Sequence, residues 1–149
     1  VTVNGGLLVQ KLDTETKEVV ADMCVTERKP SAAEIEDMNF GWRIVKHVKS
    51  NAIVVVKDGH TVGVGAGQMN RVGSAEIALK QARTAGFTEG ITLASDGFFP
   101  FDDTVTLASQ YGVTAIVQPG GSVRDEDSIK KANECGITML CTGMRHFKH

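Results

Sequence analysis

Between residues 74 and 142 the sequence alternates between polar segments of helical composition and short apolar segments, and this pattern constrains the fold more than any other feature. A glycine follows each polar segment, as is common where a helix ends. Such an alternation is typical of an α/β fold in which helices connect parallel strands. Helices are expected at 74–85, 102–111 and 125–135, and strands at 90–95, 113–118 and 137–142.

The first half of the chain predicts antiparallel pairing. Residues 5–13 and 17–25 have the pattern of a strand hairpin, which would make the sheet mixed. Residues 52–56 form a continuous apolar run, as in a strand covered on both faces, and the turn sequence KDGH at 57–60 leads into a second hairpin strand. The predicted fold class is therefore α/β, with three layers (α/β/α) and a mixed sheet.

One further helix is expected within residues 29–50. Ser31 and Glu34 have the spacing of a capping box, in which two side chains satisfy free backbone N–H groups at a helix start. Apolar residues recur at helical spacing and are expected to face the core, namely Ile35, Met38, Trp42 and Val45.

Composition indicates one soluble domain that spans residues 1–149. The formal net charge of −2 lacks the basic excess of proteins that bind nucleic acid. No apolar run approaches the roughly 20 residues of a membrane span, and no signal peptide is recognised. The three cysteines show no metal-ligand spacing, so we expect small buried side chains in a reducing compartment, the cytoplasm.

Loops rich in glycine, polar and aromatic residues follow the predicted strands. Ligands of open α/β sheets bind outside the carboxyl ends of the strands. Phe98, Phe99 and Phe101 surround Pro100 in one such loop, and we expect this aromatic loop at the rim of a ligand pocket rather than in the core. The four candidate stretches are 65–71, 95–103, 118–125 and 142–149.

None of these loops carries a familiar catalytic motif. The glycines of GVGAG (63–67) lack the spacing of a phosphate-binding loop, and the backbone N–H groups of QPGGS (118–122) suit either an anion or a plain turn. Asp96, Asp102 and Asp103 have the character of helix N-caps. The signatures of zinc deaminases and of the nucleophile elbow are missing, so no metal is expected. A pocket without a resident nucleophile indicates binding, or catalysis completed by groups elsewhere.

Five stretches, in order, resemble the C-terminal region of AICAR transformylase. This enzyme is the formyltransferase part of a bifunctional purine-biosynthesis protein whose other part is IMP cyclohydrolase. The resemblance runs from about residue 5 to residue 149, and it implies the second of two subdomains with a cytidine-deaminase-like fold but no zinc. The stretches are KHVKSNAIVVVKDG, GVGAGQMNRV, ASDGFFPFDD, QPGGSVRDED and TGMRHFKH.

The resemblance implies transfer of a formyl group from the co-substrate 10-formyltetrahydrofolate to the amino group of AICAR. It assigns the nucleotide to Asn51, Arg71, Phe98 and Arg145, and the folate to Val72, Asp103, Ser122 and Val123. These residue types suit their tasks. An amide donates and accepts hydrogen bonds, and a guanidinium can donate two hydrogen bonds to a phosphate. A phenyl ring can pack against an imidazole. A carboxylate accepts from a pterin, while valines supply apolar surface.

The chain also departs from the family. The family's catalytic Lys–His pair lies in the first subdomain, and nothing here matches it, because Lys46–His47 belongs to the helix before Asn51. Gly97 stands where the family usually has Ala, and Asp102 where it often has a basic residue. We therefore expect the isolated chain to be inactive, and to work with the first subdomain and in a homodimer.

Two other hypotheses remain. The chain could be a free-standing, non-catalytic module that binds a nucleotide or folate. A deaminase relative would need a zinc site that the sequence does not show.

Overall fold

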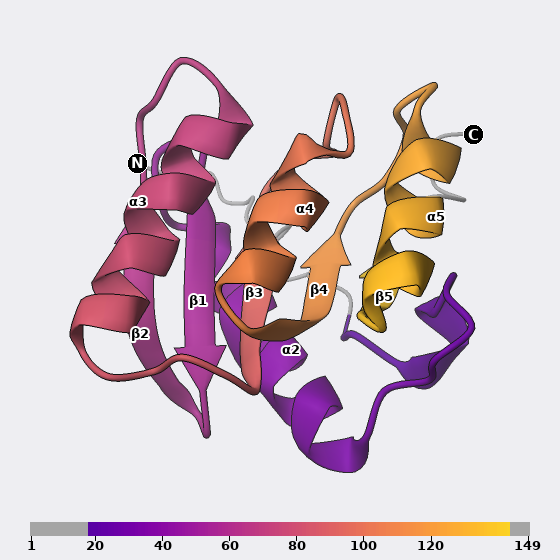
Figure 1. Cartoon of the computed structure of the whole chain (residues 1–149), viewed down its shortest axis with the longest axis horizontal. Coiled ribbons are helices and arrows are strands. Elements are labelled where there is room, and N and C mark those ends of the chain that lie inside the picture. The colour runs from indigo at the N-terminus through magenta and orange to yellow at the C-terminus, as the bar shows by residue number, and fades with distance from the viewer. Residues whose placement is uncertain (1–17, 144–149) are drawn as a thin grey trace, which may run out of the picture.

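A five-stranded sheet with the order β2-β1-β3-β4-β5 runs through the computed structural model, which describes residues 18–143 (Figure 1). β1 pairs antiparallel with both β2 and β3, while β3, β4 and β5 are parallel to one another. The sheet is therefore mixed, as predicted. The strands are β1 (Ile53–Lys57), β2 (His60–Gly65), β3 (Ile91–Ser95), β4 (Val113–Gln118) and β5 (Thr138–Cys141).

Helices cover both faces of this sheet and complete the predicted three layers. Helices α3, α4 and α5 lie side by side on the near face in Figure 1, and α2 lies behind the sheet. None of the helices between residues 18 and 143 is long and apolar enough to cross a membrane. The helices are α2 (Ala32–Val45), α3 (Arg71–Thr84), α4 (Asp103–Gln110) and α5 (Asp125–Cys135).

Two hydrophobic cores form because successive strand residues point to opposite faces. Ile53 and Val55 belong to the core under α3, α4 and α5, whereas Val54 and Val56 belong to the core under α2. All four side chains are fully buried, which explains the uninterrupted apolar run of β1.

The capping box predicted at the start of α2 is present. Ser31 Oγ accepts from the Glu34 N–H at 3.1 Å, and Glu34 Oε1 accepts from the Ser31 N–H at 2.9 Å. Met38, Trp42 and Val45 are buried as expected, whereas Ile35 is only partly buried.

The glycines of β2 allow α3 to pack directly on the strand backbone. A Cβ at Gly63 would lie 2.0 Å from the carbonyl oxygen of Ala78, and one at Gly65 would lie 1.9 Å from that of Ser74. Because neither position has room for a side chain, the GVG sequence of β2 is explained by packing.

The prediction of a strand at residues 17–25 is wrong for residues 18–25, the part that the structure describes. Ala21–Met23 forms a short 3-10 helix, η2, and only an isolated bridge joins Cys24 to Leu140. The buried Asn39 side chain explains this, because it accepts from the Val19 N–H at 2.7 Å and donates to the Val19 carbonyl at 2.9 Å, in place of a strand partner. The predicted strand at 5–13 lies outside the described residues.

Two further expectations need correction. α3 begins at Arg71 rather than at residue 74, because the Asn70 side chain accepts from the Gly73 N–H at 2.8 Å and caps the helix. Of the cysteines, Cys141 is buried as expected, but Cys24 is half-buried and Cys135 is exposed.

Candidate functional site

The sheet register brings the predicted loops to one edge of the domain. Because β1 is antiparallel to β3, Ile53 at the start of β1 pairs with Ser95 at the end of β3, and also with Gly65 at the end of β2. Gln118 likewise pairs with Cys141 at the ends of β4 and β5. The loops that follow β2, β3, β4 and β5 lie together at the top of Figure 1. We call this end of the sheet, with residues 50–52, 66–70, 96–102, 119–124 and 142–143 and the first turns of α3 and α4, the carboxyl edge.

Asp96 is the central polar group at the carboxyl edge. Its carboxylate accepts hydrogen bonds from the Ser50 hydroxyl, from the Ala52 N–H at 3.1 Å, and from Nη1 of Arg71 at 2.5 Å. The Asp96 and Arg71 side chains are only 13% and 14% exposed. The sequence predicts no role for Ser50, and it indicates a helix cap at Asp96. The position of Asp96 directly after a predicted strand was the signal that could have indicated a site residue.

The Arg71 guanidinium is held at two points. Besides the ion pair with Asp96, Nε donates to the Phe98 carbonyl at 3.2 Å. Among residues 18–143, no acceptor contacts Nη2. A Cβ at position 97 would lie 2.4 Å from Nη2, so Gly97 leaves the space that this nitrogen occupies.

Asn51 lies next to this pair. Its Nδ2 donates to the Gln68 carbonyl at 2.9 Å, and its own carbonyl accepts from the Ser74 hydroxyl at 2.6 Å. These bonds tie the segment before β1 to the loop that precedes α3 and to the first turn of α3. Of the nucleotide residues that the resemblance assigns, Asn51, Arg71 and Phe98 therefore lie at one edge, and Arg145 lies outside the described residues.

The aromatic loop is divided between the edge and the core. Phe98 is 43% exposed and Phe101 is 54% exposed, and the Arg124 guanidinium lies 5.4 Å from the Phe101 ring centre. Phe99 is fully buried in the core with Val105, so the expectation that all three rings lie at a rim is wrong for Phe99. The chain turns at this loop, and the middle ring fills the space beneath α4.

The residues assigned to folate lie on the neighbouring parts of the carboxyl edge. Val72 is partly buried in the first turn of α3, and Asp103 is exposed in the first turn of α4. Val123 is fully exposed, and Ser122 Oγ accepts from the Arg124 N–H at 2.9 Å. Asp102 takes the N-cap position of α4 without a side-chain capping bond.

The glycine turn after β4 is not a free anion site. The Asp125 carboxylate accepts from the Gly121 N–H at 2.8 Å and from the Ser122 N–H at 3.1 Å, while the Gly120 N–H donates to the Gln118 side chain at 3.2 Å. These N–H groups therefore already have acceptors, and the structure favours the plain turn over an anion cradle.

An open cavity of about 370 Å³ borders Asp96 on the side of α2. The carboxyl edge is thus hollowed next to its central carboxylate. Within the described part of the chain, no cluster of three or more His, Cys, Asp or Glu side chains could hold a metal ion. The cavity is lined by Trp42, Val45, Lys46, Val48, Ser50 and Asp96.

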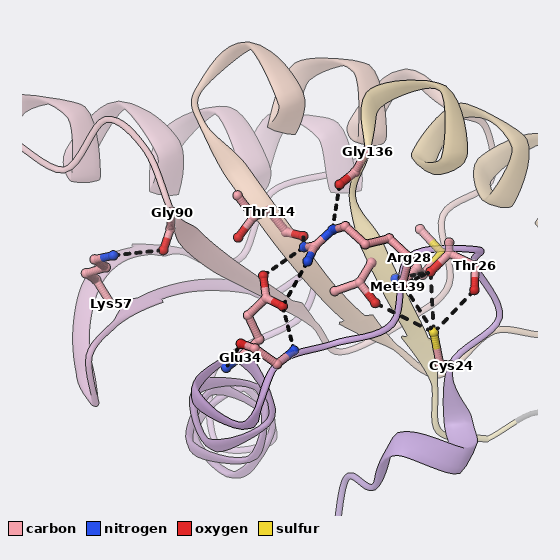
Figure 2. Close-up of polar contacts among 11 residues, drawn as sticks. Cys24, Thr26, Arg28, Glu34, Lys57, Gly90, Thr114, Gly136 and Met139 are labelled. Atoms are coloured by element: carbon pink, nitrogen blue, oxygen red, sulfur yellow. Dashed lines mark hydrogen bonds and ion pairs between the residues drawn. The ribbon is translucent and has the colours of Figure 1, made fainter.

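A separate polar network around Arg28 lies at the opposite ends of the strands (Figure 2). Arg28 donates to the Thr114 carbonyl at 2.6 Å, to the Gly136 carbonyl at 2.8 Å and to Glu34 at 2.8 Å. Burial alone would raise the pKa of Glu34, but hydrogen bonds from Arg28 and from the Ser31 N–H outweigh it and lower this pKa.

Cys24 belongs to the same edge of the molecule. Burial raises the pKa of its thiol, and hydrogen bonds with Thr26 and Thr138, together with the charge of Lys29, more than offset that effect, so the pKa is lowered. The network joins chain segments and lies at the other end of the strands from the carboxyl edge, so we interpret it as structural.

Comparison with known proteins finds a matching family model and similar curated proteins. The protein-family model AICARFT/IMPCHase bienzyme matches residues 1–81. The bifunctional purine biosynthesis protein PurH of Anoxybacillus flavithermus is 62% identical over 149 residues, and that of Bacillus subtilis is 58% identical over 148 residues. These alignments cover 100% and 99% of this chain but only 29% and 28% of the relatives, so the chain spans less than a third of their length.

Solved structures agree with the fold. A guanine deaminase from Nitrosomonas europaea matches with a TM-score of 0.50 and 18% identity, over 99% of this chain and 94% of the deaminase. A bifunctional deaminase/reductase from Thermotoga maritima matches with a TM-score of 0.51 and 21% identity, over 75% of this chain and 35% of that protein. At this identity the likeness shows the deaminase-like fold alone. The family model covers more than half of the 149 residues, and the chain therefore belongs to the AICARFT/IMPCHase bienzyme family.

Proposed function

We propose that this chain is the C-terminal, deaminase-like subdomain of the transformylase part of a bifunctional purine-biosynthesis protein. The family carries two activities, and the resemblance assigns a deaminase-like fold to the transformylase. The observation that carries the proposal is the grouping of Asn51, Arg71 and Phe98 at the carboxyl edge. In this proposal the chain works in the cytoplasm with the first subdomain and as part of a homodimer.

Each of these groups has a task in binding AICAR. Arg71 offers a fixed guanidinium to a phosphate or carbonyl oxygen, and Asn51 offers an amide that donates and accepts. The exposed ring of Phe98 provides a flat wall for the imidazole of the nucleotide. Arg145 is assigned to the same nucleotide by the resemblance alone.

The co-substrate 10-formyltetrahydrofolate would bind beside the nucleotide. Asp103, which is exposed at the start of α4, can accept from the amino group and ring N–H of the pterin, and Ser122 adds a polar contact. Val72 and Val123 supply apolar surface. No metal takes part in the proposal.

Formyl transfer also needs a group that accepts a proton when the AICAR amine attacks the formyl carbon. The family's catalytic Lys–His pair has no match in this chain, so the proposal places that step on the first subdomain. The task of this chain is then to bind and orient both substrates, which reduces the entropy cost of bringing them together.

The test separates the two activities of the family. In a full-length bifunctional protein that carries this chain, Arg71→Ala should lower formyl transfer by at least tenfold, because a hydrogen bond to a charged group contributes roughly 1.5–3 kcal/mol. Cyclohydrolase activity, measured on added formylated nucleotide, should stay unchanged. Loss of cyclohydrolase activity with intact formyl transfer would refute the proposal, and loss of neither would favour a module without a catalytic role.

A further inference from the structure

We propose that Asp96, held by Ser50 and the Ala52 backbone, is the positioning residue of Arg71, and that it affects nucleotide binding only through Arg71. This inference rests on the proposed function, since it concerns the site that would bind AICAR. It adds a residue to which neither the sequence nor the resemblance gives a role in the site.

The ion pair is protected enough to fix the arginine. Both side chains are less than 15% exposed, and a charge at such a site is costly unless it is paired and hydrogen-bonded. Asp96 meets this condition with three donors, from Arg71, Ser50 and the Ala52 N–H. Neutralising Asp96 would leave the arginine without its counter-charge.

The bonding pattern also determines where the guanidinium points. The group is planar, so bonds from Nε to the Phe98 carbonyl and from Nη1 to Asp96 fix its plane. Nη2 is left without an acceptor among residues 18–143, in the space that the missing Cβ of Gly97 leaves. An arginine held in this way binds a ligand with little further loss of side-chain entropy.

A direct contact between Asp96 and the nucleotide is disfavoured by the hydrogen bonds that the carboxylate already accepts and by its charge. Oδ1 already accepts from Arg71 and Ala52, and Oδ2 accepts from Ser50. A carboxylate would also repel an anionic nucleotide. Asp96 therefore influences the ligand through the position and charge of Arg71.

A double-mutant cycle tests this coupling. Asp96→Asn, Arg71→Ala and the double variant are made in the full-length bifunctional protein, and AICAR affinity is measured by isothermal titration calorimetry. In the parent protein, Asp96→Asn should weaken binding roughly tenfold, within the range of coupling between contacting residues. In the Arg71→Ala background the same change should alter affinity by less than about twofold.

The outcomes separate the inference from the proposed function. Equal losses in both backgrounds would overturn the inference, because Asp96 would then act independently of Arg71. Absence of AICAR binding in the parent protein, or an affinity that Arg71→Ala leaves unchanged, would overturn the proposed function as well.

Two further variants test whether a general loss of stability explains the weaker binding. Ser50→Ala removes one donor from Oδ2 of Asp96, and should weaken AICAR binding a few-fold only when Arg71 is present. Glu34→Gln, in the network at the other edge, should lower stability and leave affinity unchanged. If Glu34→Gln weakens binding as much as Asp96→Asn, general destabilisation explains the effect and the inference fails.

Discussion

Replacement of Arg28 by methionine should destabilise the fold more than loss of an ordinary surface ion pair. Arg28 joins the start of α2, the start of β4 and the end of α5 through Glu34, Thr114 and Gly136 (Figure 2). Methionine keeps most of the apolar stem and removes every donor. The variant therefore tests the polar network alone.

The expected loss follows from these contacts and their exposure. The Arg28 side chain is 41% exposed and that of Glu34 is 16% exposed, so each contact is discounted for solvent. The two carbonyl bonds contribute about 1 kcal/mol each, and the ion pair about 0.5–1 kcal/mol. Their sum, about 2.5–3 kcal/mol, corresponds to a fall in Tm of roughly 5–12 °C for a domain of this size.

The assay is urea unfolding of the chain, followed by circular dichroism, with Lys80→Met as the control. Lys80 forms an exposed ion pair with Glu76, in which the side chains are 62% and 51% exposed, so its loss should cost less than about 0.5 kcal/mol. The reasoning is refuted if Arg28→Met costs no more than Lys80→Met.

The same variant has a defined pH dependence. The pKa of Glu34 is lowered in the folded state, so the stability contributed by the carboxylate is complete above its unfolded pKa, about 4.3 for glutamate. That contribution is lost as the pH falls through the folded pKa. The difference between the parent chain and Arg28→Met should therefore shrink below about pH 4.

Two further predictions concern packing and the segment before α2. Gly65→Ala places a Cβ 1.9 Å from the Ser74 carbonyl oxygen, so it should lower the free energy of unfolding in urea by about 3 kcal/mol or more. Gly59→Ala is the control, because no atom lies within 4 Å of its Cβ, and its positive φ alone should cost about 1 kcal/mol. Equal costs would contradict the close approach of α3. Asn39→Ala removes both hydrogen bonds to Val19, so it should lower the free energy of unfolding by about 2–3 kcal/mol and speed hydrogen exchange at the Val19 amide. Unchanged exchange would show that another group holds this segment.

Local signals made much of the fold predictable. The helix at 125–135 and the strand at 113–118 are found at the expected residues, because apolar runs, polar segments and the left-handed Gly136 mark their ends. The strand at 17–25 failed because a distant side chain, Asn39, competes for its backbone groups. Such competition has no local signature.

The candidate site was predictable in its position but not in its internal bonding. Loops at the ends of strands pointed to the carboxyl edge, and the register confirms that β1, β2 and β3 bring them together. The pairing of Arg71 with Asp96 depends on the antiparallel pairing of β1 with β3 and on the path of the next loop. The burial of Phe99 between two exposed neighbours likewise depends on how the loop turns above α4.

The central claim, that the carboxyl edge of this chain holds the nucleotide, is tested most directly by a crystal structure of the full-length bifunctional protein with AICAR. The account predicts AICAR at this edge, with its imidazole against the Phe98 ring and with hydrogen bonds to Arg71 and Asn51, while Arg71 keeps its bond to Asp96. AICAR bound elsewhere, with this edge empty, would contradict it.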